Sequence, residues 1–148
     1  MNAIYHPDSY DPRASVGYLV NRIRTEILDA MDRELAPFDV TGAQYVILSQ
    51  IYFGMADSCS GLCKGISYDP GAMTRMIDRL EAKGLIRRVR NAEDRRSVNL
   101  ELTAEGKDTF PRLMEMAVGV QNRFLRGFSH SEARQLEGLL QRVLNNNT

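Results

Sequence analysis

Apolar residues recur along the first part of the chain with the spacing of an amphipathic helix. From Val16 to Leu35 they follow three- and four-residue spacings, and a proline two residues later ends the pattern. A second apolar run follows Thr41, which lies three residues before Gln44 at the spacing of a capping box. The pattern therefore predicts helices over residues 16–35 and about 42–53.

The central segment predicts two short helices joined by a turn. Residues 59–66 form a weak first helix, because two glycines lower its helix propensity. Asp69 is a suitable N-cap for the second helix, and Pro70 suits its first position. The apolar stripe of this second helix consists of Met73, Ile77 and Leu80. The stripe ends before Gly84, so the segment is a helix-turn-helix candidate.

After the helix-turn-helix candidate the hydrophobic period changes to that of a strand. Residues 97–102 alternate polar and apolar side chains, which is typical of a half-buried strand. Residues 86–90 are the expected partner strand, and the sequence NAEDRR joins the two. A β-hairpin is therefore expected to project from a helical body.

The last third of the chain predicts two more helices. Thr103 caps a long helix that extends to about Gly127, and Ser129 with Glu132 has capping-box spacing at the start of a last helix. Pro111 lies inside the long helix, where it removes a backbone hydrogen bond and should kink or locally distort the helix.

The order of these elements predicts a mainly α fold with a small β-hairpin wing, a winged helix-turn-helix. Residues 37–102 would form this DNA-binding unit. The terminal helices are too apolar to be covered by their own chain, so they need a partner chain. We therefore expect residues 1–36 and 103–148 to be dimerisation helices of a homodimer.

The composition predicts in which compartment the protein works, and the order of the charges shows where positive charge gathers. The 148 residues suit one domain, and 19 basic residues balance 19 acidic ones. Residues 64–96, however, contain nine basic and five acidic side chains. No apolar run approaches the ~20 residues of a membrane span, and the N-terminus does not resemble a signal peptide. With only two cysteines, a cytoplasmic protein without a membrane partner is expected.

The second helix of the pair carries the first set of candidate DNA contacts. With its apolar stripe turned inward, polar and small residues face outward, where they could reach base edges and phosphates in the major groove. The candidates are Gly71, Thr74 and Arg75, with Arg79 at the margin of the same face.

The tip of the hairpin carries the second set. Arg95 and Arg96 are weakly hydrated planar cations that can enter a narrow minor groove, and Asp94 could hold their guanidinium groups by a charge-assisted hydrogen bond. Three charges at a turn are, taken alone, more typical of a solvated loop. Their position after a helix-turn-helix favours the DNA interpretation.

The segment DPGAMTRMIDRLEAKGLIRRVRNAEDRRSVNLELTAEGK resembles the core of the MarR family of bacterial transcriptional regulators. The resemblance combines the run T-R-x-I-D-R-L-E-x-K-G-L-I-x-R with the wing D-R-R and the following L-T-x-E-G-K, and it extends over nearly the whole chain.

The resemblance implies a homodimer with two winged helices in successive major grooves of a pseudo-palindromic double-stranded DNA site. It assigns DNA contacts to Thr74 and Arg75, the wing acid to Asp94 and the minor-groove contact to Arg96, with Arg95 adjacent. It also implies a repressor that is released by a small phenolic or aromatic-acid ligand or by cysteine oxidation.

Two further groups of residues have alternative interpretations. Near the N-terminus, an aromatic and anion-binding pocket is one interpretation, and a mobile arm is the other. The residues of this candidate ligand site are Tyr5, His6, Tyr10 and Arg13. Cys59 and Cys63 could form a redox or metal switch, but reduced cysteines more often serve as small buried apolar side chains.

The sequence contains no catalytic motif, so neither an enzyme nor a cofactor is expected. The alternative that remains open is a winged helix that binds another protein, in the manner of an anti-repressor. A protein-binding module has no need for Arg95, Arg96 and an outward Arg75 together.

Overall fold

The computed structural model describes residues 2–66, 68–94 and 96–147, and it has the expected fold class. The described part is mainly helical with one small antiparallel hairpin, as in a winged helix-turn-helix. Three short 3₁₀ turns accompany these elements, at Pro7–Ser9, Pro12–Ala14 and Ala36–Phe38. The helices are α1 (Val16–Leu35), α2 (Gly42–Tyr52), α3 (Cys59–Ile66), α4 (Pro70–Ala82), α5 (Ala104–Phe124) and α6 (His130–Asn145), and the strands are β1 (Ile86–Arg90) and β2 (Val98–Leu102).

Most helix starts lie where the capping residues predict them. The side chains of Thr41 and Gln44 form the capping box at the start of α2. Ser129 and Glu132 form the second one at the start of α6. Asp69 accepts a hydrogen bond from the Ala72 amide at 3.0 Å and so caps α4. These hydrogen bonds satisfy amide groups that have no partner within the helix.

The weak helix over residues 59–66 forms despite its two glycines. The Ser58 hydroxyl accepts a hydrogen bond from the Gly61 amide at 3.1 Å, which supports the first turn. Leu62 is fully buried in the core, so burial of this side chain offsets the low helix propensity of the segment.

The expected end of α5 was wrong by three residues. The helix ends at Phe124 and not at about Gly127. Gly127 has a φ of 87°, a left-handed conformation that turns the chain toward α6. The residues between them form the connection and not a last helical turn. Pro111 does not break α5, which is assigned as one continuous helix through this position.

The core joins α1, α2 and α5 to the base of the hairpin. Phe110 of α5 is fully buried and its ring stacks on Tyr52 and Tyr45, with centroid distances of 4.2 and 5.6 Å. Gly106 lies against the Leu85 backbone, where a Cβ atom would come within 2.1 Å of the carbonyl oxygen. The first turn of α5 therefore packs directly against the backbone of the residue that precedes β1.

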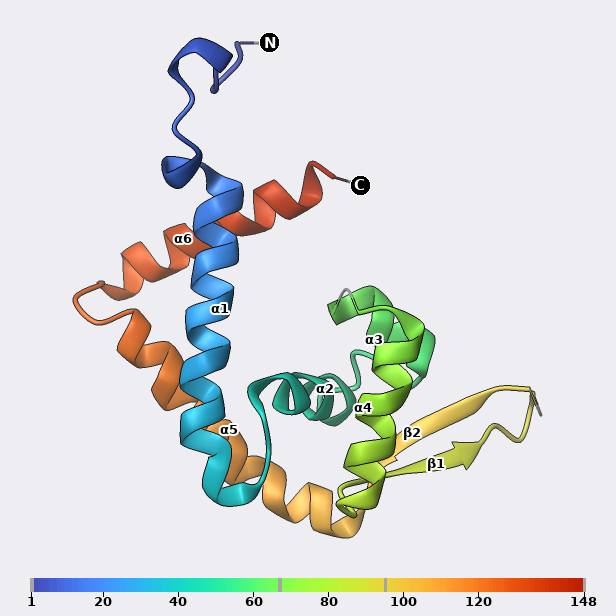
Figure 1. Cartoon of the computed structure of the whole chain (residues 1–148). Coiled ribbons are helices and arrows are strands. Elements are labelled where there is room, and N and C mark those ends of the chain that lie inside the picture. The colour runs from blue at the N-terminus through green and yellow to red at the C-terminus, as the bar shows by residue number, and fades with distance from the viewer. Residues whose placement is uncertain (1, 67, 95, 148) are drawn as a thin grey trace.

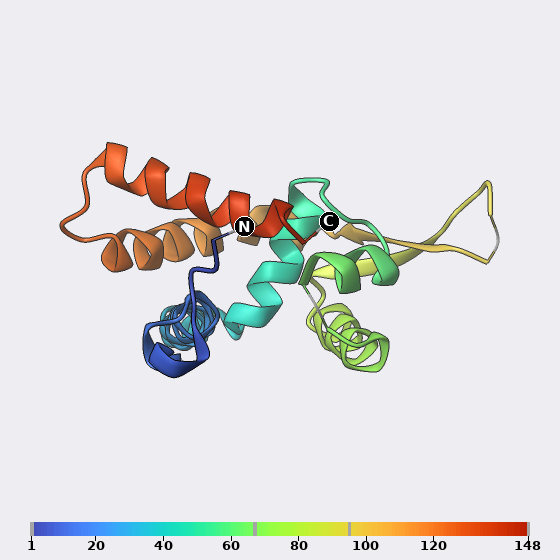
Figure 2. The ribbon, with the colours of Figure 1, turned by 90° about the horizontal axis from the view of Figure 1, so that it is seen from above.

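The helices and hairpin separate into two groups (Figures 1 and 2). Helices α1, α5 and α6 lie on one side with both chain ends, and α2, α3, α4 and the hairpin lie on the other. In both views the hairpin extends away from all helices. No described helix has the length and apolar character needed to cross a membrane.

An apolar groove runs between α1, α5 and α6. Its walls include Ile23, Phe124, Leu136 and Leu140, each at least one third exposed. Helix α6 has a single buried residue, Ala133, among its described residues. An amphipathic helix that buries so little of its apolar face on its own chain leaves that face available to another molecule.

Candidate nucleic-acid interface

The outer face of α4 presents the side chains that the sequence assigns to DNA. Gly71, Thr74, Arg75 and Arg79 are all exposed. A Cβ atom at Gly71 would lie 3.2 Å from Asp69 Oδ1 and in ordinary contact, at 3.6 Å, with an Arg75 guanidinium nitrogen. The Thr74 hydroxyl donates to the Pro70 carbonyl at 2.8 Å, and its oxygen, with the Cys59 sulfur 3.8 Å away, keeps a lone pair available as an acceptor.

Several cations of the basic segment are already paired with acids. Arg87 binds Glu101 across the hairpin at 2.8 Å. Arg88 binds Asp78 at 2.6 Å and Glu81 at 2.8 Å. Lys83 lies 3.7 Å from the Asp39 carboxylate and donates to the Asp39 carbonyl oxygen. These pairs would have to open before such cations could bind a phosphate.

The other cations of this segment have no ion pair among the described residues. They are Lys64, Arg75, Arg79, Arg90 and Arg96. We call these five the unpaired set. These cations lie on α3, on α4 and on the hairpin. Unpaired exposed cations suit phosphate binding, since they can replace condensed counterions without first losing a carboxylate partner.

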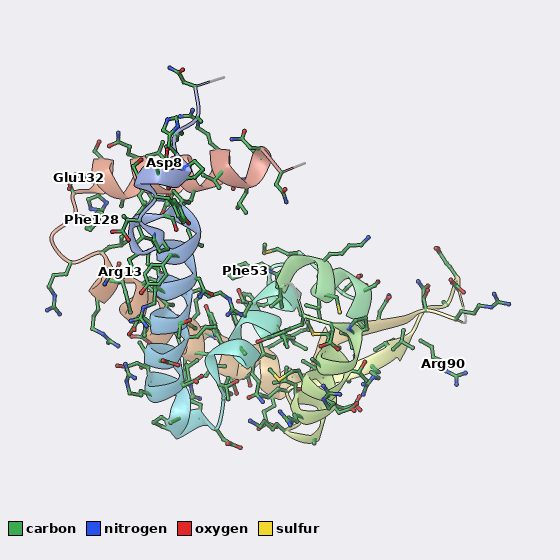
Figure 3. All side chains as sticks on the ribbon, turned by 45° about the horizontal axis from the view of Figure 1, so that its top comes forward. Asp8, Arg13, Phe53, Arg90, Phe128 and Glu132 are labelled. Carbon is green, nitrogen blue, oxygen red and sulfur yellow. The ribbon has the colours of Figure 1, made fainter. Side chains whose placement is uncertain are left out.

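Two members of the unpaired set, Lys64 and Arg90, were not among the expected site residues. Arg90 lies opposite Val98 in the last rung of the hairpin, and Figure 3 shows its side chain pointing away from the helices. The strand sequence contains three arginines, and their spacing alone does not tell which are paired. The partners come from α4 and β2, so the distinction required the folded arrangement.

At the hairpin tip, Asp94 organises the backbone and not a guanidinium group. Its carboxylate accepts from the Arg96 amide at 3.0 Å and from the Ser97 hydroxyl at 3.0 Å. Among the described residues, Asp94 makes no hydrogen bond with the Arg96 guanidinium group, and the expected bond to Arg95 falls outside them. An aspartate in a turn satisfies nearby backbone donors first, because they lie within reach at no cost in side-chain order. Arg95 lies outside the described residues.

The N-terminal candidates come together only in part. The rings of Tyr5 and Tyr10 meet edge to face at 5.5 Å, and the Tyr5 hydroxyl accepts from the Val16 amide at 2.9 Å. Arg13 lies 3.9 Å from Asp11, with 83% of its side chain exposed. His6 precedes the first 3₁₀ turn and is exposed. The hydrogen bond to Val16 places the aromatic pair at the start of α1. Figure 3 labels Arg13 beside α1.

Both cysteines are free and partly buried. Burial, with a smaller contribution from Cys59, raises the pKa of the Cys63 thiol. A raised pKa disfavours the reactive thiolate. The described residues contain no group of three or more His, Cys, Asp or Glu side chains that could hold a metal ion. The Cys59 sulfur lies 3.8 Å from the Thr74 hydroxyl on α4.

Comparison with known proteins gives consistent matches. The model of the MarR family matches residues 40–98. Multiple antibiotic resistance protein MarR of Escherichia coli is 30% identical over 139 residues, which cover 93% of this chain and 96% of that protein. HTH-type transcriptional repressor MdtR of Bacillus subtilis is 31% identical over 125 residues, or 84% of this chain and 78% of that protein.

Solved structures extend the match to the fold. The crystal structure of a mutant MarR from E. coli complexed with operator DNA superposes with a TM-score of 0.79 at 29% identity. The alignment covers 91% of this chain and 99% of that one. The fold and the arrangement of the winged helix are therefore shared along nearly the entire chain.

Proposed function

The chain belongs to the MarR family of transcriptional regulators, and from this premise we propose that it is a DNA-binding repressor that acts as a homodimer. The observation that carries the proposal is the unpaired set. These cations lie on α4, on the hairpin and at the end of α3, while neighbouring cations are neutralised by acids. Such selective exposure of positive charge suits a polyanion.

Helix α4 would enter the major groove. Thr74 and Arg75 would reach base edges there, with Gly71 allowing a close approach of the helix start and Arg79 contacting phosphate. The hairpin would lie along the flanking minor groove with Arg96 inserted and Arg95 beside it. Asp94 would support this contact indirectly, because it fixes the turn from which Arg96 projects.

The apolar groove of α1, α5 and α6 supports the homodimer. Residues 1–36 and 103–148 would form the dimerisation part, and residues 37–102 the DNA-binding part. A two-fold axis through the dimer would place two copies of α4 in successive major grooves of a pseudo-palindromic site. Occupation of a promoter by such a dimer would block transcription.

A small aromatic or phenolic effector would release the repressor from DNA. The half-exposed rings of Tyr5 and Tyr10 offer an aromatic surface at the start of α1, with His6 and Arg13 close in sequence to bind an acidic group. A ligand there could shift the spacing of the two α4 helices only if it binds one spacing more tightly than the other. The test is whether aromatic acids release labelled DNA from the parent protein. Tyr10→Ala should no longer release the DNA when the same acids are added.

The DNA-binding proposal is tested by replacing single arginines. Arg96→Ala should weaken binding by about 1–3 kcal/mol while the fold stays intact, because an exposed tip residue supports no core. Fluorescence anisotropy with a DNA duplex that the parent protein selects from a random pool provides the affinity. Arg87→Ala is the matched control, since Arg87 is neutralised by Glu101. Equal affinities for parent and Arg96→Ala would refute the minor-groove role.

A further inference from the structure

Arg88 connects the hairpin to α4 through three hydrogen bonds. Its Nη2 donates to Asp78 Oδ1 at 2.6 Å, and its Nη1 donates to Glu81 Oε1 at 2.8 Å. Its backbone amide donates to Glu81 Oε2 at 3.2 Å. Both the side chain and the main chain of β1 are therefore held by the same face of α4. The hydrogen bond with Asp78 is also the main cause of a raised pKa at Arg88.

The position of Arg88 in the hairpin makes this contact unusual. Arg88 pairs with buried Leu100 in the register, two residues outward from the pair of Ile86 and Leu102. Ile86, Leu100 and Leu102 are buried in the core, and the Leu100 amide also donates to the Asp57 carbonyl at 2.7 Å. In the outermost rung, Arg90 and Val98 are exposed. The last point at which α4 fixes the direction of the hairpin is therefore the Arg88 network.

The chemistry of the contact requires an arginine. A guanidinium group presents several donors in one plane, so it can bind two carboxylates at once and fix their relative placement. A lysine ammonium would act as a point charge without that geometry. The Arg88 side chain is one third exposed, and it joins two carboxylates in one network. A network of several charges holds its members in place better than a single exposed ion pair does.

The same network pairs a negative charge on the outward side of α4 with a cation. Asp78 shares the helical face of Gly71 and Arg75 at positions i+7 and i+3, and 58% of its side chain is exposed. An unpaired carboxylate there would repel phosphates. The Arg88 guanidinium offsets part of this negative charge from its place on the hairpin, since one cation faces the two carboxylates of Asp78 and Glu81.

We infer that Arg88 is a positioning residue that fixes the angle between the recognition helix α4 and the wing, so that base contacts and minor-groove contacts form together. This inference rests on the proposed function. Arg88 acts through Asp78 and Glu81 on one side and through the wing-tip Arg96 on the other. It does not need to touch DNA.

A double-mutant cycle in DNA binding tests the inference. In the parent, Arg96→Ala should weaken binding to the selected duplex roughly tenfold. In an Arg88→Gln background the same change should weaken binding by less than about threefold. A wing that is no longer held by α4 makes only a weak minor-groove contact, so the loss of Arg96 then costs little affinity. In an Arg87→Gln background the effect should stay roughly tenfold, although this control removes the same charge from the neighbouring residue.

Equal effects of Arg96→Ala in the parent and in Arg88→Gln would overturn the inference. Such additivity would mean either that the wing is placed without Arg88 or that Arg88 only binds a phosphate by itself. A general loss of folded protein would lower the active fraction, but it would not change the factor by which Arg96→Ala weakens binding.

A second measurement needs no DNA. Spin labels at Ala82→Cys and Ala92→Cys, with both native cysteines replaced by serine, report the distance between the end of α4 and the wing. Arg88→Gln should broaden this distance distribution, and Arg87→Gln should leave it unchanged. A distribution unchanged by Arg88→Gln would contradict the inference. If the parent selects no DNA at all, the proposed function fails, and the spin-label result still decides the role of Arg88.

Discussion

At Gly106 the structure leaves no space for a side chain. A Cβ atom would lie 2.1 Å from the Leu85 carbonyl oxygen, and this backbone cannot move aside without shifting the base of the hairpin. We predict that Gly106→Ala lowers the free energy of unfolding by about 1–3 kcal/mol in urea denaturation. The matched control is Gly138→Ala in α6, which meets nothing within 4 Å.

The control should change stability in the opposite direction. Alanine at an open helical position reduces the conformational freedom of the unfolded chain, and we expect Gly138→Ala to stabilise by about 0.5–1 kcal/mol. If Gly106→Ala left the free energy of unfolding unchanged, α5 and the residue before β1 would not be in close backbone contact.

The raised pKa of Cys63 leads to a prediction about both pH and oxidation. The folded chain holds the thiol proton more tightly than the unfolded chain does. The advantage of the folded state is therefore fully present below the ordinary thiol pKa of about 8.5 and is lost as pH rises through the raised pKa. Urea denaturation at pH 7 and at about pH 9.5 should show this loss, and Cys63→Ser should reduce it.

At neutral pH the thiol stays protonated, so peroxide should not change DNA binding of the parent protein. Cys63→Ser should then bind DNA in the same way with and without peroxide. The structural interpretation of this cysteine would be wrong if peroxide abolished binding in the parent and the serine variant prevented that loss.

Residue roles were predictable from sequence only where they depend on local spacing. Thr41, Asp69 and Ser129 cap their helices as expected, because a cap and its amide lie three residues apart. Which arginines are paired was not predictable, since Arg87 and Arg88 find their acids on other elements. For the same reason Arg90 was missed as a candidate contact.

At the scale of elements, the bounds of α1 followed from hydrophobic periodicity, and the alternation over residues 97–102 located β2, which begins one residue later at Val98. Periodicity persists where one face of an element is buried, and it stops being informative where the chain leaves the core. The end of α5 was missed because residues 125–127 form a connection whose turn depends on one glycine with positive φ. The hydrogen bonds of Asp94 with the Arg96 amide and the Ser97 hydroxyl were not predicted, because a charge pattern does not show the neutral donors of a turn.

The hairpin should contribute phosphate contacts that can be assigned to single arginines. Arg90 is unpaired and exposed, so Arg90→Gln should weaken binding about equally for all duplexes and reduce the slope of log affinity against log salt by about 1. Arg87→Gln should leave the slope unchanged, because its charge is already balanced by Glu101. Anisotropy titrations over a salt series measure both slopes. Identical slopes for the two variants would remove Arg90 from the interface.

At the scale of the whole molecule, the proposed homodimer would cover the apolar face of α6. A charge in the apolar groove would have to be buried in the proposed dimer without a partner. We predict that Leu140→Glu converts the protein from twice the chain mass of 16.7 kDa to a monomer in light scattering. Gln141→Glu places the same charge on another side of α6 and should leave the dimer intact. A parent that is monomeric at micromolar concentration would contradict the proposed assembly.

The fold class and the family resemblance could be predicted from the sequence at this scale, because caps, periods and motifs agreed along the chain. The groove between α1, α5 and α6 was expected only as an excess of apolar residues. Its walls combine side chains from opposite ends of the chain, such as Ile23 and Leu140, and no local pattern brings them together.

The measurement that tests the central claim most directly is fluorescence anisotropy of the purified protein with DNA from upstream of its own gene and with a scrambled duplex, over a salt series. Tight binding to the upstream duplex, weak binding to the scrambled one and a steep loss of affinity with salt are the predicted results. A folded protein that binds neither duplex at low salt would contradict the account and favour a winged helix that binds another protein.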